Sequence, residues 1–331
     1  MSNRKKSLRV LVTGGSGFIG AHLTNNLINL GYKVLNVDIL RSQGGIPYVN
    51  KKSKFIKGDI INKKTIEKIR KWKPEIIYHL AAQSAVEPAY DDPKFDILTN
   101  SYGTYLLCNL AKQIGVKKFI YTSSVAIYGN KKNEVINENT KIDPDSIYGV
   151  SKYAGELFVK QVLKNTSTKI IIFRLFNTYG PGENLKNQKK GMISIYSSYF
   201  WKNKPVLIKG SLKRFRDFVF IDDCIDILTK SLKVKMSKFE IFNLSFGDNY
   251  NVKKVIKLIS ESFGRKKFKY KLAKGTPGDS FGFNASGKKL KKIFKFKSYK
   301  KLSAGLKIYC EWIKKVPNKG KIERYHPLNL K

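Results

Sequence analysis

The N-terminal part of the chain contains the pattern that most constrains its fold. A run of apolar, mostly branched side chains over Leu8–Thr13 predicts a buried strand. The glycine-rich segment Gly14–Gly20 follows directly, and a helical pattern of apolar residues then continues to Gly31. Because a buried strand, a tight turn and a helix in this order form one unit of a parallel sheet covered by helices, we expect an α/β protein.

The turn itself reads Gly-Gly-Ser-Gly-Phe-Ile-Gly, with glycines at positions 14, 17 and 20. Glycine lets the backbone turn tightly and approach a pyrophosphate with no side chain between, and the helix that follows offers its N-terminal amides to the phosphates. In this context the turn predicts a dinucleotide site. We expect its contacts to come from Gly14, Gly17, Phe18, Ile19 and Gly20.

A second predicted strand, Lys33–Val37, ends at Asp38, eighteen residues beyond Gly20. A carboxylate at this place accepts hydrogen bonds from the ribose hydroxyls of adenosine and repels a 2′-phosphate, so it favours NAD over NADP. Arg41 close by works against this preference, and Asp38 could also be a simple turn residue.

The alternation of strands and helices continues to residue 175. Further strands are predicted at 55–60, 76–80, 118–123 and 169–175, and helices at 63–71, 96–114 and 145–163. This succession predicts a doubly wound parallel sheet, which we assign to residues 1–176. Because ligands bind at the carboxyl ends of such strands, the cofactor site is also expected to include Asp59, Ile60, Leu80, Ala81, Ala82 and Asn100.

The segment Phe176–Gly182 breaks this alternation. Beyond it, helices are predicted at 192–201, 222–232, 252–263 and 302–313, with short strands at 206–208 and 241–244. We interpret residues 177–331 as a smaller, mixed α/β lobe that binds the substrate, with part of it returning to the edge of the sheet.

The net charge is the most unusual property of the composition, since 65 basic and 24 acidic residues give +41. Such an excess is typical of proteins that bind nucleic acid or a membrane surface. Only nine of the basic residues are arginine, however, and the lysines are spread from Lys5 to Lys331, which indicates a general compositional bias. We therefore expect no nucleic-acid partner.

No apolar run approaches the length of a membrane span, and Met1–Arg9 leads directly into a predicted strand, so we expect neither a membrane anchor nor a signal peptide. The three cysteines and three histidines are far apart and lack the spacing of metal ligands. The expectation is a cytoplasmic protein with free thiols and no metal site.

A candidate catalytic pair lies at the start of the helix predicted at 145–163, where Asp145 and Ser146 are candidates for the N-cap. Tyr148 and Lys152 are four residues apart and are therefore neighbours on one face. A nearby ammonium favours the phenolate, so we expect the pKa of Tyr148 to lie below its ordinary value of about 10. Alone, the two residues could equally be a chance pair on a solvated face.

Together these features resemble the extended short-chain dehydrogenase/reductase superfamily. Within it the chain resembles the NAD-dependent nucleotide-sugar epimerases and dehydratases, and most of all the UDP-glucose 4-epimerases. The motifs that carry the resemblance are GGSGFIG at 14–20, HLAAQSAV at 79–86, TSSVAIYG at 122–129, YGVSK at 148–152, RLFNTYGPG at 174–182 and RFRDFVFIDD at 214–223.

The resemblance implies that Ser124, Tyr148 and Lys152 form a catalytic triad. Tyr148 would take the proton of the sugar C4 hydroxyl while NAD takes the hydride, and the resulting 4-keto sugar would turn and take the hydride back on its other face. Relatives that dehydrate or decarboxylate carry an acid just after their serine, whereas this chain has Val125 and Ala126. A 4-epimerase is therefore favoured, and 2-epimerases and reductases of the superfamily stay open as alternatives.

The resemblance also implies the residues that bind the substrate. Asn177 and Arg216 would contact the nucleotide diphosphate, and Ser84 the sugar. Asp279 and Phe283 would shape the far side of the sugar pocket.

One position departs from the family pattern. The family commonly has an arginine on the phosphates three residues before that aspartate, where this chain has Thr276. Lys271 or Lys274 could replace it. Arg216 could also be a surface partner of Asp217 rather than a phosphate ligand.

Many similar enzymes are homodimers that pair the helices predicted here at 96–114 and 148–163 into a four-helix bundle, and we expect the same of this chain. The resemblance further implies a role in surface-polysaccharide biosynthesis. A non-enzymatic alternative is an RNA-binding protein that keeps the fold, but such relatives usually lose the Tyr/Lys pair that is present here.

Overall fold

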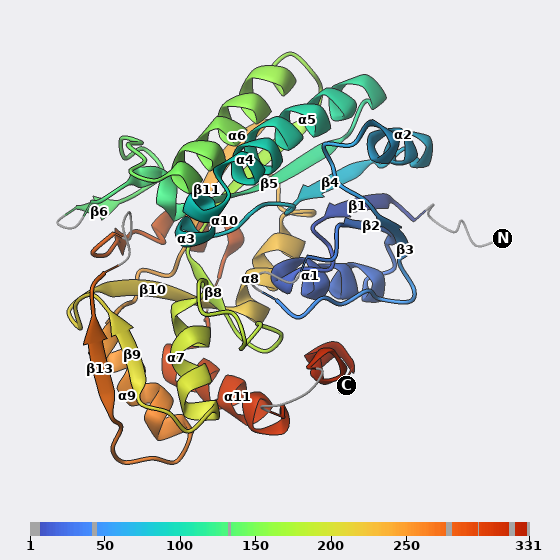
Figure 1. Ribbon diagram of the computed structural model, residues 1–331. Coiled ribbons are helices and arrows are strands. Elements are labelled where there is room, and N and C mark those ends of the chain that lie inside the picture. The colour runs from blue at the N-terminus through green and yellow to red at the C-terminus, as the bar shows by residue number, and fades with distance from the viewer. Residues whose placement is uncertain are drawn as a thin grey trace.

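The computed structural model describes residues 7–41, 45–131, 134–275, 280–296, 298–317 and 322–329. At its centre lies a sheet of seven strands in the order β11-β7-β5-β4-β1-β2-β3 (Figure 1), and every neighbouring pair is parallel. The strands are β1 (Arg9–Thr13), β2 (Lys33–Asp38), β3 (Lys54–Lys57), β4 (Ile76–His79), β5 (Lys118–Ser124), β7 (Lys169–Leu175) and β11 (Phe239–Leu244). The predicted doubly wound parallel sheet is confirmed.

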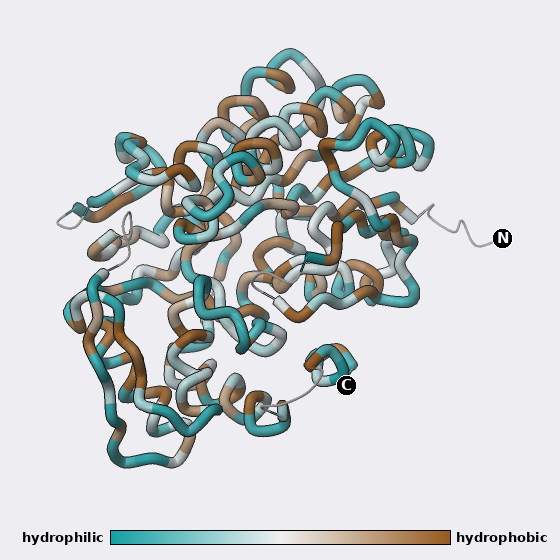
Figure 2. The backbone as a smooth tube through the Cα atoms, viewed as in Figure 1, coloured by the Kyte–Doolittle hydropathy of each residue, from teal (hydrophilic) through white to brown (hydrophobic). Residues whose placement is uncertain are grey.

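Helices cover both faces of this sheet because successive side chains of a strand point to opposite sides. Leu11 and Ile77 pack in one core with α2, α5 and α6, whereas Val10, Val12 and Tyr78 pack in the other with α1 and α8. Figure 2 shows hydrophobic segments gathered in the central strands. These helices are α1 (Phe18–Asn29), α2 (Lys63–Trp72), α5 (Gly103–Ile114), α6 (Ile147–Leu163) and α8 (Ile221–Lys230).

The long helix predicted at 96–114 is divided in the structure. A short α3 (Val86–Asp91) and α4 (Pro93–Ile97) lead into a π-helical turn (Leu98–Tyr102), and only then does α5 begin. Inside this turn the Asn100 amide donates hydrogen bonds of 3.0 to 3.1 Å to the Gln83 carbonyl, the Asp96 carboxylate and the Ser151 hydroxyl. These bonds to other segments fix a wider helical turn than the apolar pattern indicated.

The strand predicted at 55–60 is also shorter, because β3 ends at Lys57. Asp59 instead starts a turn, in which its side chain accepts the Ile61 amide at 3.1 Å and its carbonyl accepts the Asn62 amide at the same distance. A polar residue that bonds to its own backbone in this way favours a turn over a strand.

The remaining elements form a second lobe beside the carboxyl ends of the sheet (Figure 1). Its helices are α7 (Met192–Trp201), α9 (Val252–Ser262) and α11 (Leu302–Lys315). Its small sheets join β8 (Asn177–Tyr179), β10 (Phe215–Phe220) and β12 (Asn249–Asn251), then β9 (Val206–Lys209) and β13 (Tyr270–Ala273), and finally β6 (Val135–Ile136) and β14 (Asn284–Ala285). Three segments of this C-terminal half pack with the central sheet instead: β11, α8 and α10 (Lys288–Phe294).

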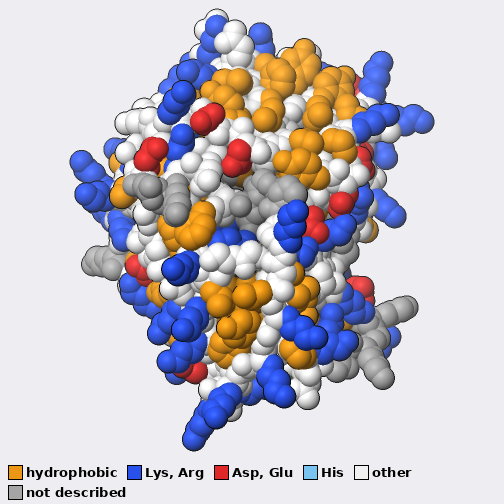
Figure 3. Space-filling model, turned by 60° about the vertical axis from the view of Figure 1, so that its left-hand side comes forward, with side chains coloured by type: hydrophobic (Ala, Val, Ile, Leu, Met, Phe, Trp, Pro, Cys, Tyr) orange, Lys and Arg blue, Asp and Glu red, His pale blue; other side chains and the backbone are white. Residues whose placement is uncertain are grey.

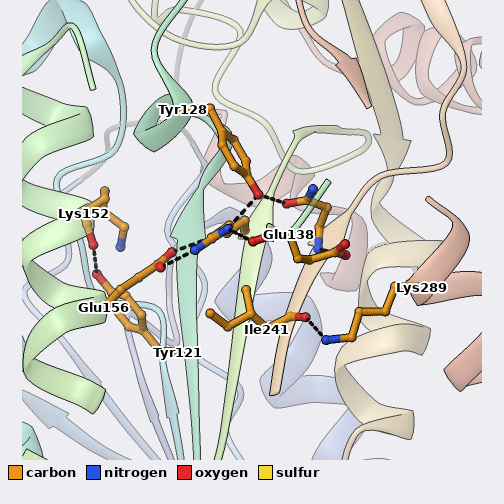
Figure 4. Close-up of polar contacts among 9 residues, drawn as sticks. Tyr121, Tyr128, Glu138, Lys152, Glu156, Ile241 and Lys289 are labelled. Carbon is orange, nitrogen blue, oxygen red and sulfur yellow. Dashed lines mark hydrogen bonds and ion pairs between the residues drawn. The ribbon is translucent and has the colours of Figure 1, made fainter. Parts of the chain in front are cut away.

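A buried polar network ties α6 to the sheet (Figure 4). The Arg174 guanidinium of β7 donates to both carboxylate oxygens of Glu156 at 3.0 and 2.8 Å and to the Tyr128 hydroxyl at 2.7 Å. The Tyr128 hydroxyl donates in turn to the Asn243 side chain of β11 at 2.7 Å. The network therefore joins α6, β7 and β11 through groups that are almost fully buried.

In the ranges that the structure describes, no helix combines the length and the apolar content needed to cross a lipid bilayer.

Candidate active site

A cleft of about 350 Å³ opens where the carboxyl ends of the central strands face residues 175–193. Its volume falls in the range of small-molecule sites. The residues predicted for the site that line this cleft are Gly14, Gly17, Phe18, Ile19, Gly20, Asp38, Asp59, Ile60, Leu80, Ala81, Ala82, Ser84, Ser124, Tyr148, Lys152 and Asn177.

The glycine turn leaves its backbone open to this cleft. Gly14 has a φ of +69°, and a β-carbon there would lie 2.7 Å from the Ala81 amide nitrogen. At Gly20 a β-carbon would overlap the Gly14 carbonyl. At Gly17, by contrast, the nearest atom would be the Gly14 carbonyl oxygen at 3.4 Å, so any side chain would extend into open space. Such an open backbone at the N-terminus of α1 suits a pyrophosphate.

Asp38 lies at the end of β2 with its carboxylate facing the same turn. The carboxylate accepts the amides of Ser16 at 3.0 Å and of Leu40 at 2.7 Å. Burial raises the pKa of Asp38, and these amide hydrogen bonds oppose the rise. Arg41 is held against Phe95, with its guanidinium carbon 4.4 Å from the ring centre. An anchored carboxylate beside the open turn fits the adenosine half of NAD.

Helix α6 delivers the predicted catalytic pair to the other end of the cleft. Ser146 caps this helix by accepting the Gly149 amide at 3.1 Å, which confirms one of the two cap candidates. The Ser124 hydroxyl lies near the Tyr148 phenol and lowers its pKa, and it accepts the Ala126 amide at 3.2 Å. The Lys152 side chain is buried, and its ammonium lies 4.4 Å from the centre of the Tyr121 ring.

Burial dominates the electrostatics of this pair. It lowers the pKa of Lys152 to about 7, against the opposing charge of Asp96. It raises the pKa of Tyr148 to about 12, while the nearby Ser124 hydroxyl lowers it and the charge of Asp96 adds to the rise. The expectation that the pKa of Tyr148 lies below 10 is therefore wrong for the protein chain by itself, because desolvation of the phenolate and the charge of Asp96 both raise this pKa.

Asn100, which was predicted to contact the cofactor, lies beneath the floor of the cleft. Its side chain is fully buried, and its amide is used in the hydrogen bonds to Gln83, Asp96 and Ser151 described above. The structure thus places it behind Ser151, which immediately precedes Lys152, rather than among the residues that line the cleft.

Two charged residues of the cleft had no counterpart in the sequence predictions. The Glu183 carboxylate is 4% exposed and accepts the Gly180 amide at 3.1 Å, and burial raises its pKa to about 8. The Lys190 ammonium donates to the Ser84 hydroxyl at 2.5 Å. Both residues follow the RLFNTYGPG motif in a loop without periodicity, so their position just after that motif was the only available signal.

The residues predicted for the substrate are divided between two places. Asn177 lines the cleft and donates to the Asp217 carbonyl at 3.1 Å. Arg216 lies outside the residues that line the cleft, where its guanidinium donates to the carbonyls of Ser280 at 2.8 Å and Phe281 at 3.1 Å. Its guanidinium carbon is 5.9 Å from the centre of the Phe283 ring.

Two of the remaining positions, Asp279 and Thr276, lie outside the described residues. Lys271 and Lys274, the possible replacements for the missing arginine, are exposed and do not line the cleft. Over the described ranges there is no group of three or more His, Cys, Asp or Glu side chains that could hold a metal ion.

Known proteins are similar in sequence to most of this chain. Residues 10–245 match the model of the NAD dependent epimerase/dehydratase family. A putative UDP-glucose 4-epimerase of Methanocaldococcus jannaschii is 33% identical over 256 residues, which are 77% of this chain and 82% of that protein. A dTDP-D-glucose 4,6-dehydratase of Mus musculus is 31% identical over 268 residues, which are 77% of this chain and 74% of that protein.

Solved structures are similar over almost the whole length. The UDP-glucose 4-epimerase of Thermotoga maritima, solved with UDP-glucose, has a TM-score of 0.87 at 30% identity and covers 93% of this chain and 99% of its own. The UDP-glucuronic acid 4-epimerase of Bacillus cereus, solved with UDP-glucuronic acid and NAD, has a TM-score of 0.84 at 28% identity and the same coverage. These four proteins do not share one named reaction, since a dehydratase stands beside the epimerases.

Proposed function

Because the chain belongs to the NAD dependent epimerase/dehydratase family, we propose that it inverts the C4 centre of a UDP-hexose and interconverts UDP-glucose and UDP-galactose. One observation carries the proposal: the side chains of Ser124, Tyr148 and Lys152 line the same cleft as the open glycine turn. A base, a hydrogen-bond partner and a cation thus lie within one site that fits NAD.

In this proposal Tyr148 takes the proton of the C4 hydroxyl and later returns it. Ser124, whose hydroxyl lies near Tyr148, holds the same hydroxyl in place. Bound NAD supplies a hydride acceptor at C4, which later gives the hydride back, and a positively charged ring beside the phenol. Lys152 adds its ammonium to that positive charge and holds the nicotinamide ribose.

Epimerisation is favoured over dehydration by the two residues that follow Ser124. A dehydration must protonate a leaving hydroxyl, and Val125 and Ala126 have no proton to give. The alternatives within the family are a 2-epimerase, another nucleotide-sugar epimerase and a reductase. A reductase is distinguished by its consumption of reduced cofactor, whereas an epimerase regenerates its NAD in each turnover.

The test is a panel of nucleotide sugars incubated with the purified protein and NAD, with the products identified by chromatography. We expect UDP-glucose to give UDP-galactose, and the reverse, without net change in NAD. Formation of a 4-keto-6-deoxy sugar, or turnover only with added NADH, would contradict the proposal.

We further propose that the protein is a homodimer built on α5 and α6. Apolar and aromatic side chains that are 37% to 54% exposed gather on α4, the π turn, α5 and α6, and these are Ile97, Tyr102, Tyr105, Val150 and Leu157. Figure 3 shows hydrophobic side chains on the upper part of the molecule, where Figure 1 places these helices. A second copy could cover this surface, because apolar patches of this kind commonly mark interfaces.

A further inference from the structure

The loop 45–48, which lies between β2 and β3, forms a wall of the cleft beside the glycine turn. Gly45 and Pro47 line the cleft together with Ser16 of the turn and Phe18 of α1. The loop backbone lies directly against α1, because a β-carbon at Gly45 would be 2.5 Å from the Phe18 amide nitrogen. The shape of the cleft beside the turn therefore depends on where this loop is held.

Backbone hydrogen bonds connect the loop to two other segments around the cleft. The Tyr48 amide donates to the Ser16 carbonyl of the glycine turn at 3.1 Å, and the Ile46 amide donates to the Gly182 carbonyl at 2.9 Å. A segment held by single hydrogen bonds opens more easily than a strand within a sheet or a helix. The packing of the Tyr48 ring is therefore important for the position of the loop.

The Tyr48 ring packs on a residue of the C-terminal segment 322–329. The His326 ring is stacked on it, with the ring centres 4.6 Å apart and the planes inclined by 13°. His326 is fully buried, and burial lowers its pKa to about 3, so both rings are uncharged at neutral pH. The His22 ring of α1 lies 5.9 Å from the other ring of this name, His326. Aromatic pairs at such distances add to the stability that burial provides.

The C-terminal segment is itself anchored to the second lobe. The indole nitrogen of Trp312 in α11 donates to the Tyr325 carbonyl at 2.9 Å, and the Ile322 side chain is buried in the larger core. Figure 1 shows the C-terminal end of the chain near α1 and α11. A continuous series of contacts thus leads from α11 through His326 and Tyr48 to the glycine turn.

We infer that His326 is a positioning residue for NAD: by stacking on Tyr48, it keeps the loop 45–48 against the glycine turn. The inference concerns how tightly the cofactor is held, and it depends neither on the sugar nor on the reaction. Neither of the two rings is among the residues that line the cleft, so their effect on NAD must act through the loop. When the loop leaves this position for part of the time, the apparent dissociation constant rises as the fraction of binding-competent protein falls.

Calorimetric titration of NAD into protein freed of bound cofactor tests the inference. His326→Leu removes the aromatic face but keeps an apolar side chain, whereas His326→Phe keeps the aromatic face. We expect NAD to bind roughly three- to tenfold more weakly to His326→Leu, and within about twofold of wild type to His326→Phe. Tyr48→Leu should weaken NAD binding to the same extent, and combining it with His326→Leu should add little further loss, because the two rings form one contact.

A core change elsewhere in the second lobe separates positioning from stability. Val255→Ala on α9, a fully buried position on a helix that packs against α7 and α11, should lower the Tm while NAD affinity stays within about twofold of wild type.

Two results would overturn the inference. The first is a His326→Leu variant that binds NAD as tightly as wild type, which would leave the C-terminal segment with a structural role alone. The second is an equal loss of NAD affinity in His326→Phe and His326→Leu, which would show that the aromatic face does not position the loop. Where His326→Leu does not fold, wild-type NAD affinity in Tyr48→Leu would overturn the inference in its place.

Discussion

Helix α6 presents two buried cationic sites with opposite surroundings. Near its middle, Glu156 receives two hydrogen bonds from Arg174, and this ion pair raises the pKa of the guanidinium although burial alone would lower it. One turn earlier, Lys152 is equally buried, but its ammonium lies over an aromatic ring and its pKa falls to about 7. The same helix therefore holds one cation that is fully neutralised and one that is kept destabilised.

The difference separates a structural site from a reactive one. Arg174 has its charge cancelled and its donors occupied, so it fixes α6 against the sheet (Figure 4). Lys152 and Tyr148 are desolvated at the cleft, where a bound ligand can provide the polar partners that the chain does not provide. A buried group without a matched partner in a cleft is the usual mark of a functional site.

The largest effect is expected at the reactive site. Tyr148→Phe removes only the proton-carrying oxygen and should lower turnover roughly 10²- to 10⁴-fold, the usual contribution of a positioned acid–base group. The quantity of NAD that copurifies should stay at the wild-type level, since the ring remains. Near-normal turnover in this variant would remove Tyr148 from the mechanism.

Breaking the ion pair of the structural site should lower the stability of the fold. Glu156→Gln leaves Arg174 charged and without its carboxylate, so we expect the free energy of unfolding to fall by about 3 kcal/mol. Denaturant unfolding of wild type and variant measures this difference. A free energy of unfolding that changes by less than about 0.5 kcal/mol would show that the Arg174–Glu156 pair does not stabilise the fold.

Replacing the reactive cation should raise the free energy of unfolding, whereas breaking the Arg174–Glu156 pair should lower it. The pKa of Lys152 is lowered from 10.5 to about 7 in the folded state, so its charge opposes folding fully below about pH 7 and this cost disappears as the pH rises toward 10.5. Lys152→Met should therefore stabilise the fold by roughly 1 to 2 kcal/mol at pH 7 and by less at pH 10. The buried Asp96, whose pKa is raised to about 6, can take up a proton when its neighbour is removed.

Denaturant unfolding at the two pH values tests this sign, with Lys160→Met on the exposed side of the same helix as a control that should show no such pH dependence. A loss of stability at pH 7 in Lys152→Met would place Lys152 with Arg174 as a structural cation.

The smallest effect is expected on the outer face of α6, which belongs to neither site. Val150 and Leu157 are 54% and 48% exposed. The double change Val150→Lys and Leu157→Lys should shift the protein from dimer to monomer while turnover per subunit changes less than about threefold. Light scattering after gel filtration measures the mass, and a wild type that is itself monomeric would contradict the proposed interface.

The sequence was sufficient for the parts of the fold that rest on local periodicity. The strands at 9–13, 33–38 and 169–175 are apolar runs bounded by turn residues, and the resemblance to the superfamily is confirmed by the matched family model. The division of the helix at Asn100 could not be predicted, because it depends on hydrogen bonds to residues far away in sequence. Strand β10 was not predicted, because Arg216 and Asp217 interrupt its apolar pattern and only the whole fold buries these two polar side chains.

For the site, the spacing of Tyr148 and Lys152 in the sequence predicts that they are neighbours, but it does not determine their pKa values. The i,i+4 relation depends only on the helix, whereas the pKa of Tyr148 depends on burial that the whole fold produces. Lys190 was likewise one lysine among many until the structure placed it in the cleft.

The most direct test of the epimerase account is the fate of a deuterium placed at C4 of the sugar in the UDP-linked substrate. After reaction in ordinary water with the NAD-loaded wild type, NMR of the epimer should show the label still at C4 of the inverted sugar, with no accumulation of NADH. An epimer that has lost the label to solvent, or a labelled sugar that never inverts, would contradict the account.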